Sequence, residues 1–194
     1  LCALLQGDAW PEVRAAAARG LAGNPALAGC LAKGLQDPDQ GVQIAAATAA
    51  GRSGEAGLIQ GLRALAGDPR GPLPARVEAL VSLARLGDAG PARTVLTTHL
   101  SKGGIVPLAR AAVRALDLAE APDDRPTLRA ALESPAWPVR LAAASALVRQ
   151  ADPDGLRRVG ALSRELGGRQ GASLRALLPA VGGSEPDPAD VDPE

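Results

Sequence analysis

The sequence is almost without aromatic residues: it has no phenylalanine and no tyrosine, and Trp10 and Trp137 are its only tryptophans. Isoleucine, tyrosine and phenylalanine, which favour strands, are nearly missing, and this scarcity argues against a β-rich fold. Alanine, leucine, glycine, valine and arginine dominate instead. Alanine combines high helix propensity with a side chain small enough for helices to approach closely, so we expect an all-α protein.

Residues that carry chemistry are equally scarce. His99 is the only histidine, and Cys2 and Cys30 are the only cysteines. A zinc site needs several such ligands close together, and a nucleophilic triad needs a histidine beside its nucleophile. No glycine-rich loop follows a predicted strand, as a phosphate-binding loop would require. We therefore expect no enzyme, no cofactor and no metal ion.

The chain also has no apolar run that approaches the roughly 20 residues needed to span a bilayer, and no secretory signal is visible. Cys2 and Cys30 fall at apolar helical positions, where an unpaired cysteine packs as a small hydrophobe. We expect free thiols in a reducing cytoplasm and no membrane contact. The bias toward alanine, glycine, arginine and proline is typical of a GC-rich bacterial genome. The opening "LCALLQ" resembles "LAKGLQ" at Leu31–Gln36, which predicts that the chain is part of a longer protein.

Charge is balanced over the whole sequence but not along it. Five of the 21 acidic residues lie among the last ten residues, and no lysine or arginine accompanies them there. Residues 1–181 consequently carry 21 basic and 16 acidic side chains, a mild positive surplus. The proline-broken acidic stretch at 182–194 is predicted to be a disordered tail or linker.

An internal repeat organises the rest of the chain. The phrase "AWPEVRAAAARGLAG" near Val13 recurs as "AWPVRLAAASALV" near Val139, and related stretches begin between and after them. The six anchor positions are Val13, Val42, Ala75, Leu108, Val139 and Leu174, separated by 29, 33, 33, 31 and 35 residues. Small apolar residues three, four, seven and eight positions after most anchors define one face of a helix.

A second, leucine-marked helix precedes each later anchor helix. These outer helices are predicted at Pro25–Gln36, Glu55–Ala66, Pro91–Lys102, Asp124–Glu133 and Gly155–Leu166. About six helix pairs, with the first incomplete, predict an α-solenoid over residues 1–181, in which each pair buries its apolar face against its neighbours.

The phrase Val-Arg-x-Ala-Ala-x-x-Ala-Leu after an aspartate-bearing turn resembles the short HEAT repeats of the bilin-lyase-like type. "DAWPEVRAAAARGLAG" and "SPAWPVRLAAASALV" match best, and the resemblance extends over residues 1–181. It implies a right-handed superhelical stack. It leaves activity open, because such repeats serve in scaffolds, accessory subunits of enzymes and chromophore lyases.

The residue after each anchor forms a predicted column on the inner face of the stack. Its candidate partner-binding members are Arg14, Gln43, Arg76, Arg140 and Arg175, with Ala109 as the exception. Two interpretations remain open. Either each side chain bonds to a turn of an adjacent repeat, or the column receives an acidic partner segment.

Trp10 and Trp137 occupy matching places before helix-starting prolines. They either seal the joint between neighbouring pairs or act as exposed binding anchors. Arg110 and Arg114, and likewise Arg125 and Arg129, are like-charged pairs four residues apart and are candidate anion-binding patches, whereas the default expectation for the arginines of the outer helices is a solvated face.

The predicted function is that of a non-catalytic scaffold or adaptor whose inner-helix face binds another protein or peptide, with an acidic segment as one option. Two alternatives remain: a nucleic-acid-binding solenoid and a bilin-lyase-like accessory subunit. Well-separated tryptophans and a mild charge surplus make nucleic acid the weaker of the macromolecular partners.

Overall fold

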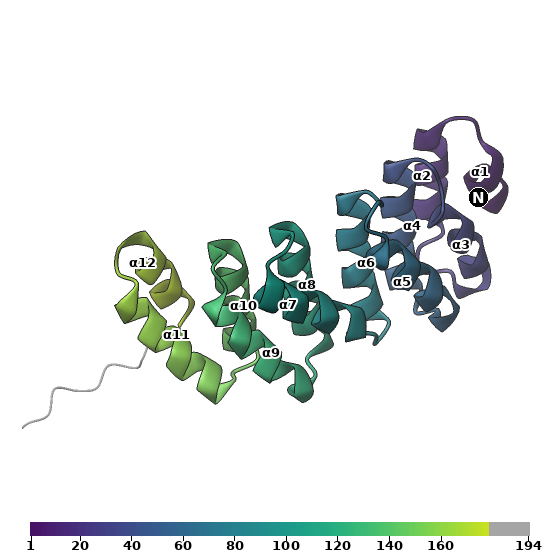
Figure 1. Ribbon diagram of the computed structural model, residues 1–194. Coiled ribbons are helices and arrows are strands. Elements are labelled where there is room, and N and C mark those ends of the chain that lie inside the picture. The colour runs from purple at the N-terminus through teal and green to yellow at the C-terminus, as the bar shows by residue number, and fades with distance from the viewer. Residues whose placement is uncertain (179–194) are drawn as a thin grey trace, which may run out of the picture.

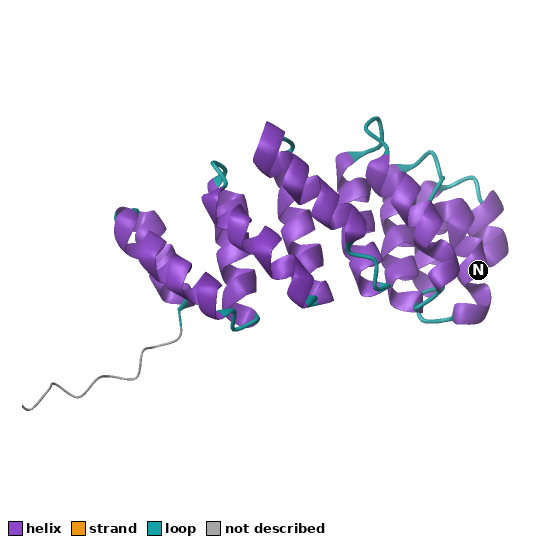
Figure 2. Cartoon of the chain, turned by 60° about the horizontal axis from the view of Figure 1, so that its bottom comes forward, coloured by secondary structure: helices purple, strands orange, loops and turns teal. Residues whose placement is uncertain are grey.

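The computed structural model describes residues 1–178, and the predicted tail at 182–194 lies outside them. Throughout the described residues the regular elements are helices, and no strand forms. The helices stack as successive antiparallel pairs into an elongated solenoid (Figures 1 and 2). The predicted fold class is confirmed.

One helix of each pair begins close to an anchor position, and these inner helices lie side by side in a single row (Figure 1). They are α2 (Pro11–Gly20), α4 (Gln40–Ser53), α6 (Leu73–Arg85), α8 (Val106–Ala119), α10 (Trp137–Arg149) and α12 (Gly168–Leu177).

The outer helices form the second row and are more often broken by short 3₁₀ turns. They are α1 (Cys2–Gly7), α3 (Leu31–Gly34), α5 (Ile59–Gly67), α7 (Gly90–Lys102), α9 (Arg125–Ala130) and α11 (Pro153–Glu165). The 3₁₀ turns are η1 (Pro25–Cys30), η2 (Ala56–Leu58), η3 (Pro122–Asp124) and η4 (Ala131–Glu133).

The two rows contribute different side chains to one continuous core. Inner helices bury mostly alanine, as in α4, where Ala45, Ala46 and Ala47 are nearly inaccessible. Outer helices bury leucines such as Leu62 and Leu96. Small residues let neighbouring inner helices approach closely, while leucines fill the wider space between the rows.

Helix ends follow local sequence signals. Asp39 caps α4 by accepting a hydrogen bond from the Val42 backbone N–H at 3.0 Å, and Asp152 caps α11 in the same way through Gly155. Gly54 ends α4 with a φ of 72°, a left-handed conformation that glycine adopts without strain.

Five of the six anchor residues are buried, as the repeat predicts: Val42, Ala75, Leu108, Val139 and Leu174. Val13 is the exception, with 36% of its surface exposed. It stands on α2, the first inner helix of the stack, which packs against a following inner helix, α4. The anchor pattern therefore predicts burial correctly from the second helix pair to the last, Leu174 included, and overestimates it only at the N-terminal end of the stack.

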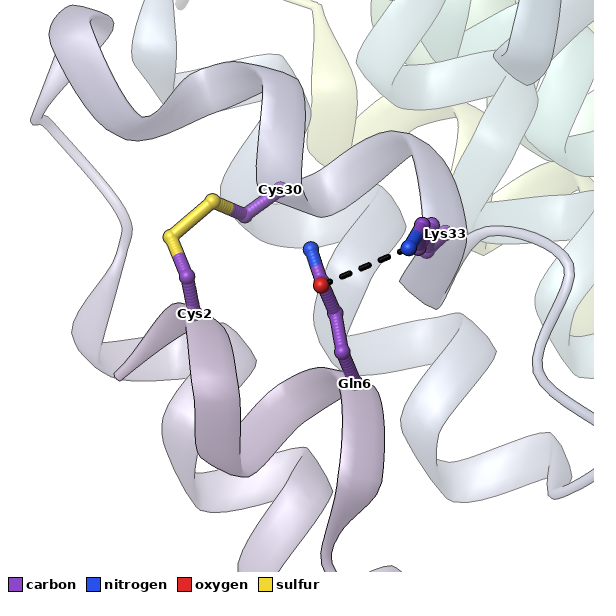
Figure 3. The surroundings of a disulfide bond; sticks show 4 residues. All are labelled: Cys2, Gln6, Cys30 and Lys33. Carbon is purple, nitrogen blue, oxygen red and sulfur yellow. Dashed lines mark hydrogen bonds between the residues drawn. A yellow bond between two sulfur atoms is a disulfide. The ribbon is translucent and has the colours of Figure 1, made fainter.

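Cys2 and Cys30 form a disulfide, so the expectation of two free thiols is wrong (Figure 3). The first outer helix α1 packs against η1 and α3, and this contact brings the two Cα atoms to 5.5 Å. Lys33 also donates to Gln6 across the same segments, at 3.4 Å. The prediction of a cytoplasmic location rested partly on free thiols and stays a prediction without that support.

None of the helices within residues 1–178 is both long and apolar enough to cross a bilayer.

Candidate binding groove on the inner helices

Arg14 is the most fully bonded member of the predicted column. Its Nε and Nη2 atoms donate to the two carboxylate oxygens of Asp37, each at 2.8 Å, and its Nη1 donates to the Asp8 carbonyl at 3.0 Å. The Arg14 hydrogen bond holds the pKa of Asp37 below its ordinary value, although burial of the carboxyl acts in the opposite direction. The pair therefore fastens the inner helix of one repeat to the turn of the next.

The other members of the column bond to backbone carbonyls near the helix joints. The acceptors are the carbonyls of Asp37 for Gln43 (2.9 Å), Ala66 for Arg76 (3.2 Å), Ser134 for Arg140 (2.9 Å) and Ser163 for Arg175 (2.8 Å). Ala109 is fully buried at the corresponding place in the fourth copy. These four side chains thus bond within their own helix pairs, and only Arg14 reaches the turn of an adjacent repeat as the structural interpretation expected. The partner-binding role of the column stays a prediction.

Arginines of the outer helices are paired with carboxylates of neighbouring segments, which sequence reasoning missed. The pairs are Arg63–Asp88, Arg93–Asp124, Arg129–Asp152 and Arg158–Glu133, at 2.5–2.8 Å. In the first three pairs, the arginine of an outer helix precedes its aspartate by 23–31 residues. This recurring separation in the sequence could have predicted the pairs. Arg129 holds the pKa of the buried Asp152 below its ordinary value.

The two tryptophans occupy different environments despite their matching sequence context. Trp10 is 70% exposed, whereas Trp137 is partly buried and packs against the core. The packing interpretation therefore fits Trp137 and not Trp10. Their role as binding anchors stays a prediction.

A groove of about 430 Å³ lies on the inner helices and is here called the inner groove. It crosses α6, α8 and α10, and this size falls within the range of about 300–1,000 Å³ typical of ligand pockets. Its floor is apolar, with the side chains of Val77, Val81 and Ala142. Most of the residues that line the groove stand two, three or six positions after an anchor, whereas the column residues stand directly after one. The groove therefore lies beside the predicted column and not on it.

Three arginines line the inner groove: Arg110, Arg114 and Arg149. Arg149 is paired with Asp117, while Arg110 and Arg114 are exposed and have no ion-pair or hydrogen-bond partner among the side chains of residues 1–178. Glu78 also lines the groove and is paired with Arg85 at 3.4 Å. The groove therefore keeps a net positive charge beside an apolar floor.

Two further hollows lie elsewhere on the described residues. A groove of about 270 Å³ between α2 and α4 has Arg19 and Arg52 at its sides and continues the inner face. A groove of about 440 Å³ lies between the outer helices α7 and α9 and is lined without any charged side chain. Charge therefore distinguishes the grooves of the inner row from that of the outer row.

His99 lies on the outer helix α7, as predicted, but its side chain is buried. Its Nε2 atom is 3.4 Å from the Ser134 hydroxyl. Within residues 1–178, no three histidine, cysteine, aspartate or glutamate side chains come together as a metal site would require.

Comparison with known proteins agrees with this architecture. The model of the family described as HEAT repeats matches residues 1–84. Among solved structures, the chain is similar to the complex of CpcE and CpcF of phycocyanin lyase from Nostoc sp. PCC7120. The TM-score is 0.63 and the identity 23%, over 84% of this chain and 68% of that chain.

A weaker likeness is to human deoxyhypusine hydroxylase in complex with glycerol, with a TM-score of 0.37 and 17% identity, over 88% of this chain and 79% of that one. No curated protein sequence matches the chain.

The likeness to phycocyanin lyase contradicts the prediction that the chain is not an enzyme. That prediction rested on the lack of a recognisable catalytic constellation in the sequence. A solenoid of the same fold belongs to a lyase complex, so the lack of a triad is no ground for excluding an enzyme.

Proposed function

Since residues 1–84 of this chain are HEAT repeats within a longer solenoid, we propose that the protein binds a segment of another protein along its inner helices. The observation that carries this proposal is the pair of grooves on one continuous face, over α2 and α4 and over α6, α8 and α10. An extended or helical segment contacts several repeats at once, whereas a small ligand would occupy a single hollow.

The column next to the grooves supports binding indirectly. Arg14, Arg76 and Arg140 hold turns and helix ends in place, so the inner helices keep a fixed spacing. A surface whose parts are already fixed loses little conformational entropy when a partner binds. These three arginines are poor probes of binding, because their replacement would also disturb the stack.

Photo-crosslinking at defined positions tests the proposal. A crosslinking amino acid would replace Val77 on the inner groove, Ile44 on the α2–α4 groove, or Thr97 on the outer groove. In extracts of the source cells, we expect adducts with the same partner protein at the two inner positions and not at the outer one. Adducts formed only from Thr97, or with no protein at any position, would contradict the proposal.

A second candidate is a bilin-lyase-like subunit, which the similarity in fold to the phycocyanin lyase complex favours. The protein would then bind a linear tetrapyrrole, whose propionate groups suit the arginines of the inner groove. Titration of phycocyanobilin with the purified protein, followed by visible absorbance, tests this function. An unchanged spectrum at saturating protein would eliminate it.

A further inference from the structure

We infer that the inner groove receives an acidic, amphipathic segment of the partner protein, with Arg110 and Arg114 binding its carboxylates. This inference rests on the proposed function and specifies the chemistry of the partner at one place in the solenoid.

The first step is the contrast between paired and unpaired arginines. Arg63, Arg93 and Arg129 on the outer helices each have a carboxylate partner at 2.5–2.7 Å. Arg110 and Arg114 have none among residues 1–178, although they lie on a helix at the middle of the stack. Their charges therefore remain available to a ligand.

The spacing of the two arginines is the second step. Positions four residues apart lie on the same face of α8, and like charges at this spacing oppose helix formation. An added carboxylate between them would relieve this repulsion and form charge-assisted hydrogen bonds with two guanidinium groups. The pair consequently favours an anionic group of the partner over a neutral one.

The apolar floor is the third step. Val77 and Ala142 lie beside the arginines in the same groove and are partly exposed, while Val81 is almost completely buried beneath them. A ligand that presented charge alone would leave this floor uncovered. A segment that places leucine-like side chains near aspartate or glutamate satisfies both parts of the groove.

The same groove is poorly suited to nucleic acid. Arg149 is already paired with Asp117 and Glu78 with Arg85, so only Arg110 and Arg114 remain for phosphates, whereas a nucleic-acid backbone is bound by a larger set of cations. Base stacking needs aromatic side chains, and neither Trp10 nor Trp137 lines the groove. The charges and floor together favour an acidic polypeptide.

Selection from a display library of random linear peptides provides the test. We expect the selected peptides to be enriched in aspartate and glutamate close to leucine, isoleucine or phenylalanine. The double variant Arg110→Glu/Arg114→Glu should weaken their binding by at least about tenfold. The matched control Arg164→Glu/Arg169→Glu has the same change in charge at exposed positions outside the groove, and its affinity should stay within about twofold.

A second variant tests the floor. Ser145 lines the inner groove, and Ser145→Trp would fill it without changing charge. We expect a similar loss of peptide binding, with circular dichroism confirming that helix content is retained in all variants.

The possible outcomes separate this inference from the proposed function. Peptides that bind equally well to the wild type and to the Arg110→Glu/Arg114→Glu variant would overturn the inference, while crosslinks from Val77 and Ile44 would still support the scaffold. If no peptide were selected and no crosslink formed, both this inference and the proposed function would be overturned. Duplex DNA that binds with steep salt dependence, and only when Arg110 and Arg114 are present, would replace the acidic polypeptide with nucleic acid.

Discussion

Gly51 marks a close approach between the inner helices α4 and α6, and its replacement by alanine tests how tightly the inner row is packed. A Cβ atom at this position would lie 2.6 Å from Ser82 Oγ, 2.7 Å from Ser82 Cβ and 2.9 Å from Ser82 Cα. Rotation of the Ser82 side chain cannot relieve contacts with its Cβ and Cα. The two helix backbones would have to move apart.

Two opposing effects set the magnitude. Alanine is favoured over glycine inside a helix by about 1 kcal/mol, and overpacking a close-packed core costs about 1–3 kcal/mol. Gly51→Ala should therefore lower the free energy of unfolding by up to about 2 kcal/mol. Gly160 lies inside α11 with only the flexible end of Arg164 near its added Cβ, at 3.9 Å, so Gly160→Ala should raise stability by about 1 kcal/mol.

The comparison of these two alanine variants is the measurement. A difference of about 1–3 kcal/mol corresponds to roughly 2–12 °C in the thermal midpoint for a chain of this length, followed by far-ultraviolet circular dichroism. Adding Ser82→Gly to Gly51→Ala removes two of the three contacts and should reduce the cost of the alanine. If Gly51→Ala raised the free energy of unfolding as much as Gly160→Ala, the close contact between α4 and α6 would be refuted.

Three further predictions concern other contacts. Cys30→Ser removes a disulfide that spans 28 residues and should lower the free energy of unfolding by about 3.5 kcal/mol. Reduction of the wild type should lower it by a similar amount, and equal stability of the oxidised and reduced wild type would contradict this. Because Arg129 lowers the folded pKa of Asp152, this carboxylate stabilises the fold above its unfolded pKa of about 3.9, and the effect is lost as the pH falls through the folded value. Asp152→Asn should therefore show a shallower loss of stability on acidification than wild type, and parallel curves would refute the pairing. Trp137→Ala should cost about 1–3 kcal/mol and Trp10→Ala less than about 0.5 kcal/mol in thermal melts, and equal effects would contradict their different burial.

The helix pairs could be predicted from the sequence because a repeated pattern supplies several independent copies of the same signal. The outer helix predicted at Pro91–Lys102 is α7, which begins one residue earlier. Breaks within the outer helices were not predicted. The segment Pro25–Gln36 forms η1 followed by the short α3, and Gly29 within it weakens a regular helix.

The candidate site was predicted less well, because the position of a side chain along a helix does not say what stands opposite it. The column of Arg14 and its equivalents was placed on the inner helices, but its hydrogen bonds within the chain depend on turns from other segments. The disulfide likewise forms because α1 folds back against η1, and the spacing of Cys2 and Cys30 in the sequence does not predict that contact. Spacing indicated Arg110 with Arg114 and Arg125 with Arg129 alike; only the structure shows that Arg129 is paired with Asp152, and that Arg110 and Arg114 lie in a groove formed with α6 and α10.

The ion pairs within residues 1–178 show which arginines are neutralised by carboxylates and which are not. On the outer row, Arg63, Arg93 and Arg129 are neutralised by carboxylates that also belong to turns and caps, so these charges serve the stack. On the inner row, Arg110 and Arg114 hold no such partner within residues 1–178, and the apolar floor beside them is open to a ligand. Two cations without a carboxylate partner among these residues therefore lie beside an apolar floor on the face where neighbouring repeats form grooves, and a partner segment that combines carboxylates with apolar side chains would be drawn to this groove.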